Sequence, residues 1–132
     1  MTAEVHHIGE VAVAVGLSLK TIRHYDEVGV VPPSGRSAGG FRLYTDEDIE
    51  RLRLVKLMKP LDFTLDEMRQ LLQARDELGS EDLTVERRED LRGRLAMFAA
   101  LVEQRSLRLR EQLDAVEGLS SLLHQEAAAV EE

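Results

Sequence analysis

The last third of the chain carries an apolar repeat that a single helix cannot bury on its own. Between residues 91 and 123, ten positions are separated by alternating steps of four and three, and eight of them are apolar. The ten positions are Leu91, Leu95, Phe98, Val102, Arg105, Leu109, Gln112, Val116, Leu119 and Leu123. This spacing is typical of a coiled-coil seam. We therefore predict a dimerisation helix over residues 84–124, in which the eight apolar positions meet a second helix and the two polar ones help to set the register.

Two short helices joined by a tight turn are predicted near the amino end. Apolar residues recur at helical spacing over residues 8–15, and Gly16 offers the left-handed conformation that ends a helix. Ser18 is a good N-cap for a second helix that ends near Gly29. This is the spacing of a helix-turn-helix.

The second of these helices is predicted to have one inward and one outward face. Lys20, Thr21 and His24 recur every three or four residues near its start, so they share a face that is free to meet DNA. The residues expected to pack inward are Leu19, Ile22 and Val28.

A hairpin is predicted after this helix. Val30 and Val31 favour a strand, the following prolines stop a helix, and the letters SGRSAGG form a flexible tip before the returning strand FRLY. Because side chains alternate along a strand, Arg42 and Tyr44 share one face, from which Arg42 can reach a phosphate backbone.

Two further helices have clear start signals. Thr45 with Asp48, and Thr64 with Glu67, match capping boxes, and apolar residues follow each pair at helical spacing.

The predicted organisation is a DNA-binding domain over residues 1–76, a linker over 77–83, the dimerisation helix over 84–124, and a short tail over 125–132 with no evident sensor domain. The expected fold class is mainly α.

Charge is unevenly distributed along the chain. The net charge of −8 lies entirely in residues 61–132, because residues 1–60 carry eight basic and eight acidic side chains. Residues 18–44 hold four basic and two acidic side chains, so a phosphate-binding surface is expected there.

Composition excludes several kinds of chemistry. The chain has no cysteine, which rules out disulfides and thiolate metal sites, and no apolar run reaches the roughly 20 residues of a membrane span. We expect a cytoplasmic protein without metal or other cofactor. His6, His7 and His124 are interpreted as non-ligands, the first two in a frayed tail. The Glu47–Asp48 pair opens a helix, and Ser120 and Ser121 lack a His and Asp pattern, so no enzyme is predicted.

Three stretches resemble the MerR family of bacterial transcription regulators. They are IGEVAVAVGLSLKTIRHYDEVGVVPP, GGFRLYTDEDIERLRLVKLMK and FTLDEMRQLL, in the family's order over about residues 8–72. The resemblance implies a winged helix-turn-helix followed by a coiled-coil helix that pairs antiparallel with its copy. The candidate DNA-binding residues are Ser18, Lys20, Thr21, Arg23, His24, Tyr25, Arg36, Gly40, Arg42 and Tyr44. His24 either reads a base edge or merely faces solvent.

The sequence departs from the family pattern at two places. Phe41 stands where many relatives carry Tyr, which removes a possible phosphate hydrogen bond. Asp62 stands where relatives commonly have Gly, and Pro60 removes an N–H donor, so the angle between the third and fourth helices is left open.

The resemblance implies a homodimer that binds and distorts a pseudo-palindromic promoter, with double-stranded promoter DNA and RNA polymerase as partners. A small-molecule effector is possible but unidentified, and neither the target promoter nor activation or repression can be read from the sequence. The alternative is a DNA-architectural or adaptor protein that recruits a partner through its coiled coil.

Overall fold

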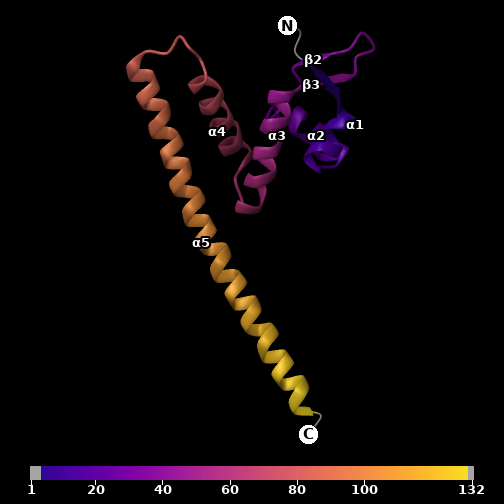
Figure 1. Cartoon of the computed structure of the whole chain (residues 1–132), viewed down its shortest axis with the longest axis vertical. Coiled ribbons are helices and arrows are strands. Elements are labelled where there is room, and N and C mark those ends of the chain that lie inside the picture. The colour runs from indigo at the N-terminus through magenta and orange to yellow at the C-terminus, as the bar shows by residue number, and fades with distance from the viewer. Residues whose placement is uncertain (1–3, 131–132) are drawn as a thin grey trace. The chain divides into compact units, whose positions relative to one another are not determined.

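The elements of the chain were assigned from a computed structural model that describes residues 4–130 (Figure 1). They are β1 (Val5–His7), α1 (Ile8–Val15), α2 (Leu19–Glu27), β2 (Gly35–Arg36), β3 (Arg42–Thr45), α3 (Asp46–Met58), the 3-10 turn η1 (Lys59–Leu61), α4 (Leu65–Leu78) and α5 (Val85–Val130). The first compact unit ends at Leu95 and the second begins at Ala96. The predicted mainly α fold, a winged helix-turn-helix followed by a long helix, is confirmed.

The turn between α1 and α2 forms as the sequence predicts. Gly16 has φ 69°, and its N–H donates to the carbonyl of Ala12 at 2.9 Å. Ser18 caps α2 by accepting a hydrogen bond from the N–H of Thr21 at 3.1 Å. A Cβ added at Gly16 would also lie 2.7 Å from Nζ of Lys56, so both backbone conformation and space favour glycine there.

The small sheet differs from the predicted hairpin. Its strand order is β1-β3-β2, with both pairs antiparallel. The prediction that Val30 and Val31 form a strand is wrong, because their N–H groups both donate to the carbonyl of Tyr25, at 2.9 and 3.1 Å. Both side chains are buried, so the two valines cover the end of α2. The frayed tail predicted around His6 and His7 is wrong as well, because both belong to β1.

The third and fourth helices begin at the predicted capping boxes, Thr45 with Asp48 and Thr64 with Glu67. Helix α3 gives way to η1 at Lys59, one residue before Pro60. Asp62 then adopts φ 58°, and among residues 4–130 it is the one non-glycine with positive φ. Glycine takes this conformation without steric cost. The chain therefore keeps a glycine-like backbone at Asp62 without the glycine.

The core of the first unit is almost entirely aliphatic, as a chain with few aromatic residues requires. It is built from Val11, Val15, Ile22, Tyr25, Val30, Val31, Tyr44, Ile49, Leu52, Val55, Met58, Phe63, Met68, Leu72, Ala74 and Leu91. These side chains come from α1, α2, the loop after α2, β3, α3, the loop after η1, α4 and the start of α5. The core thus fixes α2 to α3 and α4, the two helices that follow the sheet.

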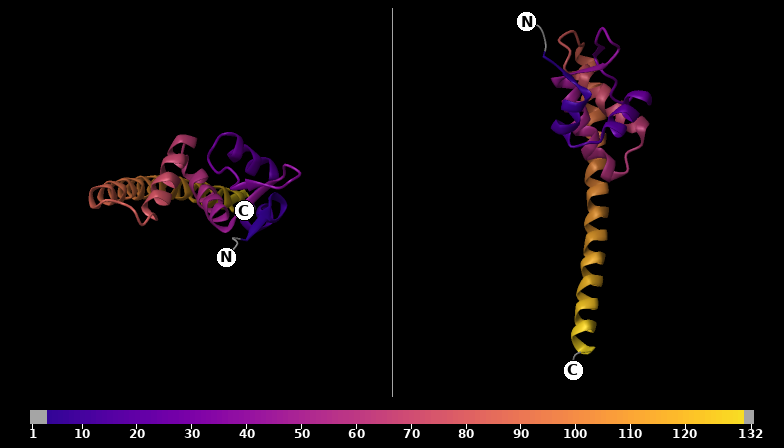
Figure 2. Two further views of the ribbon diagram at one scale, coloured as in Figure 1. Left: turned by 90° about the horizontal axis from the view of Figure 1, so that it is seen from above. Right: turned by 90° about the vertical axis from the view of Figure 1, so that its right-hand side faces the viewer.

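Helix α5 is one uninterrupted helix of 46 residues (Figure 2). It begins one residue after the predicted start and continues to Val130, so the predicted tail is helical over residues 125–130; residues 131–132 lie outside the described part. Every residue from 107 to 130 is exposed. None of the described helices is both long and apolar enough to cross a membrane.

Candidate nucleic-acid interface

One face of α2 is open to solvent. Lys20, Arg23 and His24 are exposed and Thr21 is half-buried, whereas Ile22 on the opposite face is completely buried. The helix is therefore amphipathic in the predicted sense, and its outer face carries two cations and an imidazole. Leu19 differs from the prediction: it is 39% exposed because it lies in the first turn, ahead of the residues that pack on the core.

The two tyrosines of the predicted DNA surface lie beneath it. Tyr25 is 3% exposed and packs against the ring of His24, with the ring centroids 5.9 Å apart. Tyr44 is 0% exposed, and its hydroxyl has no hydrogen-bond partner among the described residues. Burial raises the pKa of both phenols. The prediction that Tyr44 contacts DNA is wrong, because its side chain is completely buried in the core.

The wing, residues 35–45, ends in a tight turn. Gly40 has φ 82°, and its N–H donates to the carbonyl of Ser37 at 2.9 Å. Arg36 donates through Nη1 to the carbonyl of Gly40 at 3.1 Å, which braces the turn. Phe41 beside it is 69% exposed. Gly40 is therefore needed for the shape of the tip, and its contact with DNA stays a prediction.

Asp26 joins the wing to α2, a connection that the sequence analysis missed. Its Oδ2 accepts from Nε of Arg42 at 2.7 Å and lies 3.5 Å from Nη2 of Arg36. The hydrogen bond with Asp26 raises the pKa of Arg42 above its ordinary value. Part of the positive charge counted between residues 18 and 44 is thus already neutralised within the protein.

Two cations from later helices bind the ends of the helix-turn-helix. Lys56 of α3 donates to the carbonyl of Val15, the last residue of α1, at 2.9 Å. Arg69 of α4 donates through Nε and Nη2 to the carbonyl of Val28, just beyond α2, at 3.1 and 2.8 Å. The carboxyl end of a helix carries partial negative charge, so both contacts are electrostatically favourable. Both residues lie 41 positions from their acceptors, so no local pattern could have predicted these contacts.

A buried carboxylate holds the base of the wing. Asp48 is 3% exposed, and its Oδ2 accepts from the N–H groups of Ser34 and Thr45 at 3.1 and 3.0 Å and from Oγ of Ser34 at 2.5 Å. Its Oδ1 accepts from Nη1 of Arg51 at 2.8 Å, and Arg51 in turn donates to Asp76 of α4. The predicted structural role of Asp48 is confirmed, and its charge is fully compensated.

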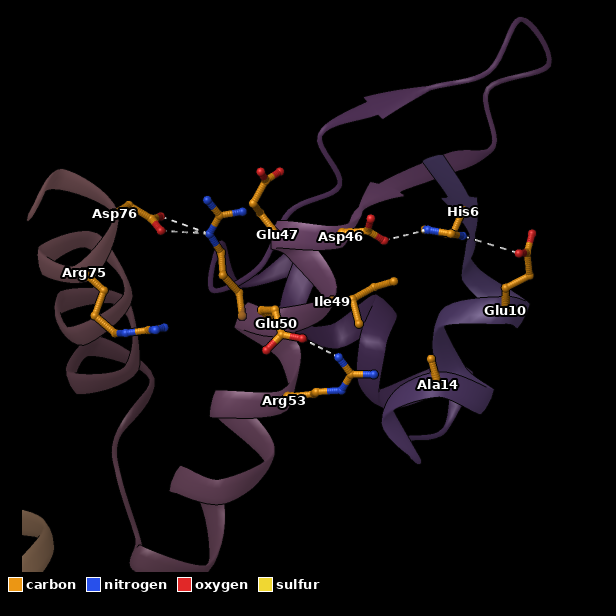
Figure 3. A pocket seen from close by; sticks show the side chains of 11 residues that line it. His6, Glu10, Ala14, Asp46, Glu47, Ile49, Glu50, Arg53, Arg75 and Asp76 are labelled. Atoms are coloured by element: carbon orange, nitrogen blue, oxygen red, sulfur yellow. Dashed lines mark hydrogen bonds and ion pairs between the residues drawn. The ribbon is translucent and has the colours of Figure 1, made fainter. Parts of the chain in front are cut away.

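A shallow pocket lies beside β1, α1 and α3 (Figure 3). His6 stands there between Asp46, at 2.9 Å, and Glu10, at 3.5 Å. Its hydrogen bond with Asp46, reinforced by Glu10, raises the pKa of His6. His6 was interpreted as a non-ligand from its spacing in the sequence, but the fold brings possible ligand atoms of Glu4, His6 and Asp46 within 4.8 Å of one another. These contacts are explained by ion pairing, and the absence of a metal stays a prediction.

The predicted seam on α5 changes character along its length. Leu91 is completely buried within the first unit, so its assignment to a dimer interface is wrong. Leu95, Phe98 and Val102 are half-buried. The distal seam, namely Leu109, Val116, Leu119 and Leu123, is between 40% and 64% exposed.

Two helices joined by a tight turn, followed by a wing and by supporting helices, define a winged helix-turn-helix DNA-binding protein. A sequence profile of the MerR HTH family regulatory proteins matches residues 7–75, which is more than half of the chain. The chain therefore belongs to the MerR family of helix-turn-helix regulatory proteins.

Individual relatives agree with this assignment. The HTH-type transcriptional activator TipA of Streptomyces coelicolor is 36% identical over 103 residues, which cover 75% of this chain and 40% of TipA. The mercuric resistance operon regulatory protein of Bacillus cereus is 38% identical over 78 residues, covering 58% of this chain and 59% of that protein. The chain thus spans less than two thirds of the length of these relatives.

Solved structures also resemble the chain. HiNmlR, a MerR family regulator lacking the sensor domain and bound to promoter DNA, matches with a TM-score of 0.67 and 26% identity, covering 96% of this chain and 94% of that one. PbrR691 from Ralstonia metallidurans CH34, in complex with lead(II), matches with a TM-score of 0.55 and 29% identity, covering 91% and 84%.

Proposed function

We propose that this regulator acts as a homodimer whose two α5 helices pair antiparallel along the distal seam. The observation that carries the proposal is the exposure of that seam: four large aliphatic side chains repeat along a helix that its own chain does not cover. Burying a Val or Leu side chain contributes roughly 1.5 to 3 kcal/mol. Four such positions on each of two chains supply the driving force for association.

The proposed dimer would hold two copies of α2 against one face of a pseudo-palindromic promoter. The outer face of α2 would enter the major groove, with Lys20 and His24 near base edges and Arg23 on the phosphate backbone. The further proposed contacts are Ser18, Thr21, Arg36, Arg42 and the backbone at Gly40. Tyr25 would support this surface from below.

Promoter distortion is a further part of the proposal. Two recognition helices at a fixed separation favour DNA whose half-sites match that separation, and bending or untwisting a site of this size costs on the order of 1 to 6 kcal/mol. A rigid dimer would supply that energy, and RNA polymerase would then engage the distorted promoter. The likeness to HiNmlR, which is bound to promoter DNA and lacks a sensor domain, supports promoter DNA as the partner of the described part of the chain.

Val116 and Leu107 provide a matched test of the dimer. Both are exposed, at 64% and 58%, but Val116 lies on the distal seam and Leu107 on the opposite face of α5. Val116→Asp should give monomers in light scattering, because burying an unpaired charge is strongly unfavourable. The DNA probe is a duplex that the parent protein has selected from random sequence. The variant should no longer protect this duplex in a footprinting experiment. Leu107→Asp introduces the same charge and should leave both properties intact.

A Val116→Asp variant that stays dimeric would overturn pairing along the distal seam. A monomeric variant that still protects both half-sites would overturn the role of the dimer in DNA binding. Straight DNA in the parent complex, measured by fluorescence transfer between the duplex ends, would overturn promoter distortion alone. Binding without any effect on transcription in a reconstituted polymerase assay would favour the adaptor alternative.

A further inference from the structure

Two arginines of the wing face each other across the sheet. Arg36 on β2 and Arg42 on β3 are direct partners in the antiparallel register. Like charges directly opposite one another on neighbouring strands repel and destabilise the pair. Asp26, near the end of α2, relieves this repulsion because its Oδ2 lies 2.7 Å from Arg42 and 3.5 Å from Arg36.

This cluster is partly shielded from solvent. The side chain of Asp26 is 15% exposed and that of Arg42 is 23% exposed, whereas Arg36 is 51% exposed. Partly buried pairs are screened by salt much less than exposed ones. The bond between Asp26 and Arg42 therefore persists at ionic strengths that weaken surface ion pairs, and Arg36 is held more loosely.

The same carboxylate also competes with DNA. A phosphate that approaches the wing must take arginine donors away from Asp26 or use those that Asp26 leaves free. Arg42 has a guanidinium with five N–H donors, and Asp26 accepts from Nε. Asp26 thereby limits how far, and in which direction, Arg42 can reach toward a phosphate.

We propose that Asp26 is a specificity-determining positioning residue, which holds the wing arginines against the recognition helix so that they engage phosphates in one placement of the wing. Without it, Arg42 and Arg36 would bind phosphates of any sequence. Asp26 thus lowers sequence-independent binding and favours the operator. The inference rests on the proposed function, because it needs the wing to contact DNA.

Glu27 offers a charge-matched control. It neighbours Asp26 and is exposed, and its charge is the smallest of the causes that raise the pKa of Arg42, whereas Asp26 is the largest. Asp26→Asn and Glu27→Gln each remove one negative charge with almost no change in shape. The probes are a duplex selected from random sequence by the parent protein and a scrambled duplex of the same composition. Affinity for each is measured over a series of salt concentrations.

For Asp26→Asn, we expect the salt slope on scrambled DNA to steepen by about one unit, because each newly neutralised phosphate contributes about 0.9. The ratio of selected-site to scrambled affinity should fall by about tenfold, within the range of coupling between contacting residues. Glu27→Gln should change neither the slope nor the ratio by more than about twofold. In an Arg42→Ala background, Asp26→Asn should lose most of its effect.

Three results would overturn the inference. If Asp26→Asn and Glu27→Gln changed the salt slope and the affinity ratio equally, the effect of Asp26 would be one of net charge alone. Equal loss on both duplexes with an unchanged slope would leave it a purely structural residue. Additive effects of Asp26→Asn and Arg42→Ala would show that Asp26 does not act through Arg42. A parent protein that shows no preference for its selected duplex would instead refute the proposed function, while the slope on scrambled DNA would still report on Asp26.

Discussion

The first unit and the distal part of α5 are stabilised in different ways. In the first unit, aliphatic side chains from helices and a strand meet in one core, and the ends of α1 and α2 are bound by cations from α3 and α4. Along residues 107–130 of α5, every side chain is exposed. Single helices gain most of their stability from packing. The first unit therefore carries its own stability, whereas distal α5 gains no stability from packing within its own chain.

Truncating one leucine in each of the two regions should test this difference with the largest expected effect. Leu91→Ala removes a completely buried side chain and should lower the free energy of unfolding of the first unit by about 2 to 5 kcal/mol. The loss should not depend on protein concentration. Leu119→Ala should instead weaken association, so its effect on thermal unfolding should depend on protein concentration and disappear at dilutions where the parent protein also dissociates. Calorimetry over a hundredfold concentration range checks both, and identical concentration dependence would contradict the distinction.

A buried charge should be the next most sensitive feature of the first unit. Asp48→Ala leaves the N–H groups of Ser34 and Thr45 and the guanidinium of Arg51 without their common acceptor. Breaking a buried pair in this way costs about 3 kcal/mol. Urea unfolding measures the loss, and Glu47→Gln, an exposed carboxylate one residue earlier, should change stability by less than about 0.5 kcal/mol. A comparable loss in both variants would show that total charge on α3 matters rather than burial.

The cation that binds the end of α2 should contribute less. Arg69→Ala removes two hydrogen bonds to the carbonyl of Val28, and since the side chain is 41% exposed we expect a loss of about 1 kcal/mol. Amide hydrogen exchange should accelerate at the end of α2 in particular. Uniform acceleration throughout the first unit would instead indicate general destabilisation.

A substitution in the turn after η1 should raise the stability of the first unit rather than lower it. Asp62→Gly places glycine at φ 58° and should raise the free energy of unfolding by about 0.5 to 1 kcal/mol, because a left-handed residue with a side chain is strained. Asp66→Gly, in the first turn of α4, should lower stability instead. Chemical denaturation of both variants measures the two signs, and destabilisation by Asp62→Gly would show that the Asp62 side chain makes a compensating contact.

The smallest expected effect is the contribution of His6 to the pH dependence of the free energy of unfolding. Its pKa is raised in the folded state by Asp46 and then Glu10, so the protonated form stabilises the fold. This contribution is complete below the unfolded pKa of about 6.5 and is lost as pH rises through the higher folded value. His6→Gln should flatten the stability profile over that window. His124→Gln, on exposed α5, should leave the profile unchanged, and equal flattening in both would contradict the assignment.

Local sequence signals predicted much of this molecule. The left-handed turn at Gly16 and the caps at Ser18, Thr45 and Thr64 depend on neighbouring residues, so their patterns were sufficient. Errors arose where tertiary contacts override local preference. Val30 has strand propensity, but it follows the end of α2. Its N–H donates to the carbonyl of Tyr25 in that helix instead of to a neighbouring strand.

The side-chain environment of the interface was harder to predict. Strand alternation placed Arg42 and Tyr44 on one face of β3 but could not say that Tyr44 is completely buried while the side chain of Arg42 stays 23% exposed. Leu91 fits the seam by spacing, yet the first unit covers it. Partners such as Asp26 for Arg42 are brought together only by the folded chain, which is why their charges looked independent in the sequence.

Helix α4 also has a mechanical consequence. Through Arg69 it holds the carbonyl of Val28 beyond α2, and through Glu77 it binds Arg87 in the early turns of α5 at 2.6 Å. Asp76 anchors the same helix to Arg51 of α3. Helix α4, anchored on α3, therefore links the start of α5 directly to the carboxyl end of α2.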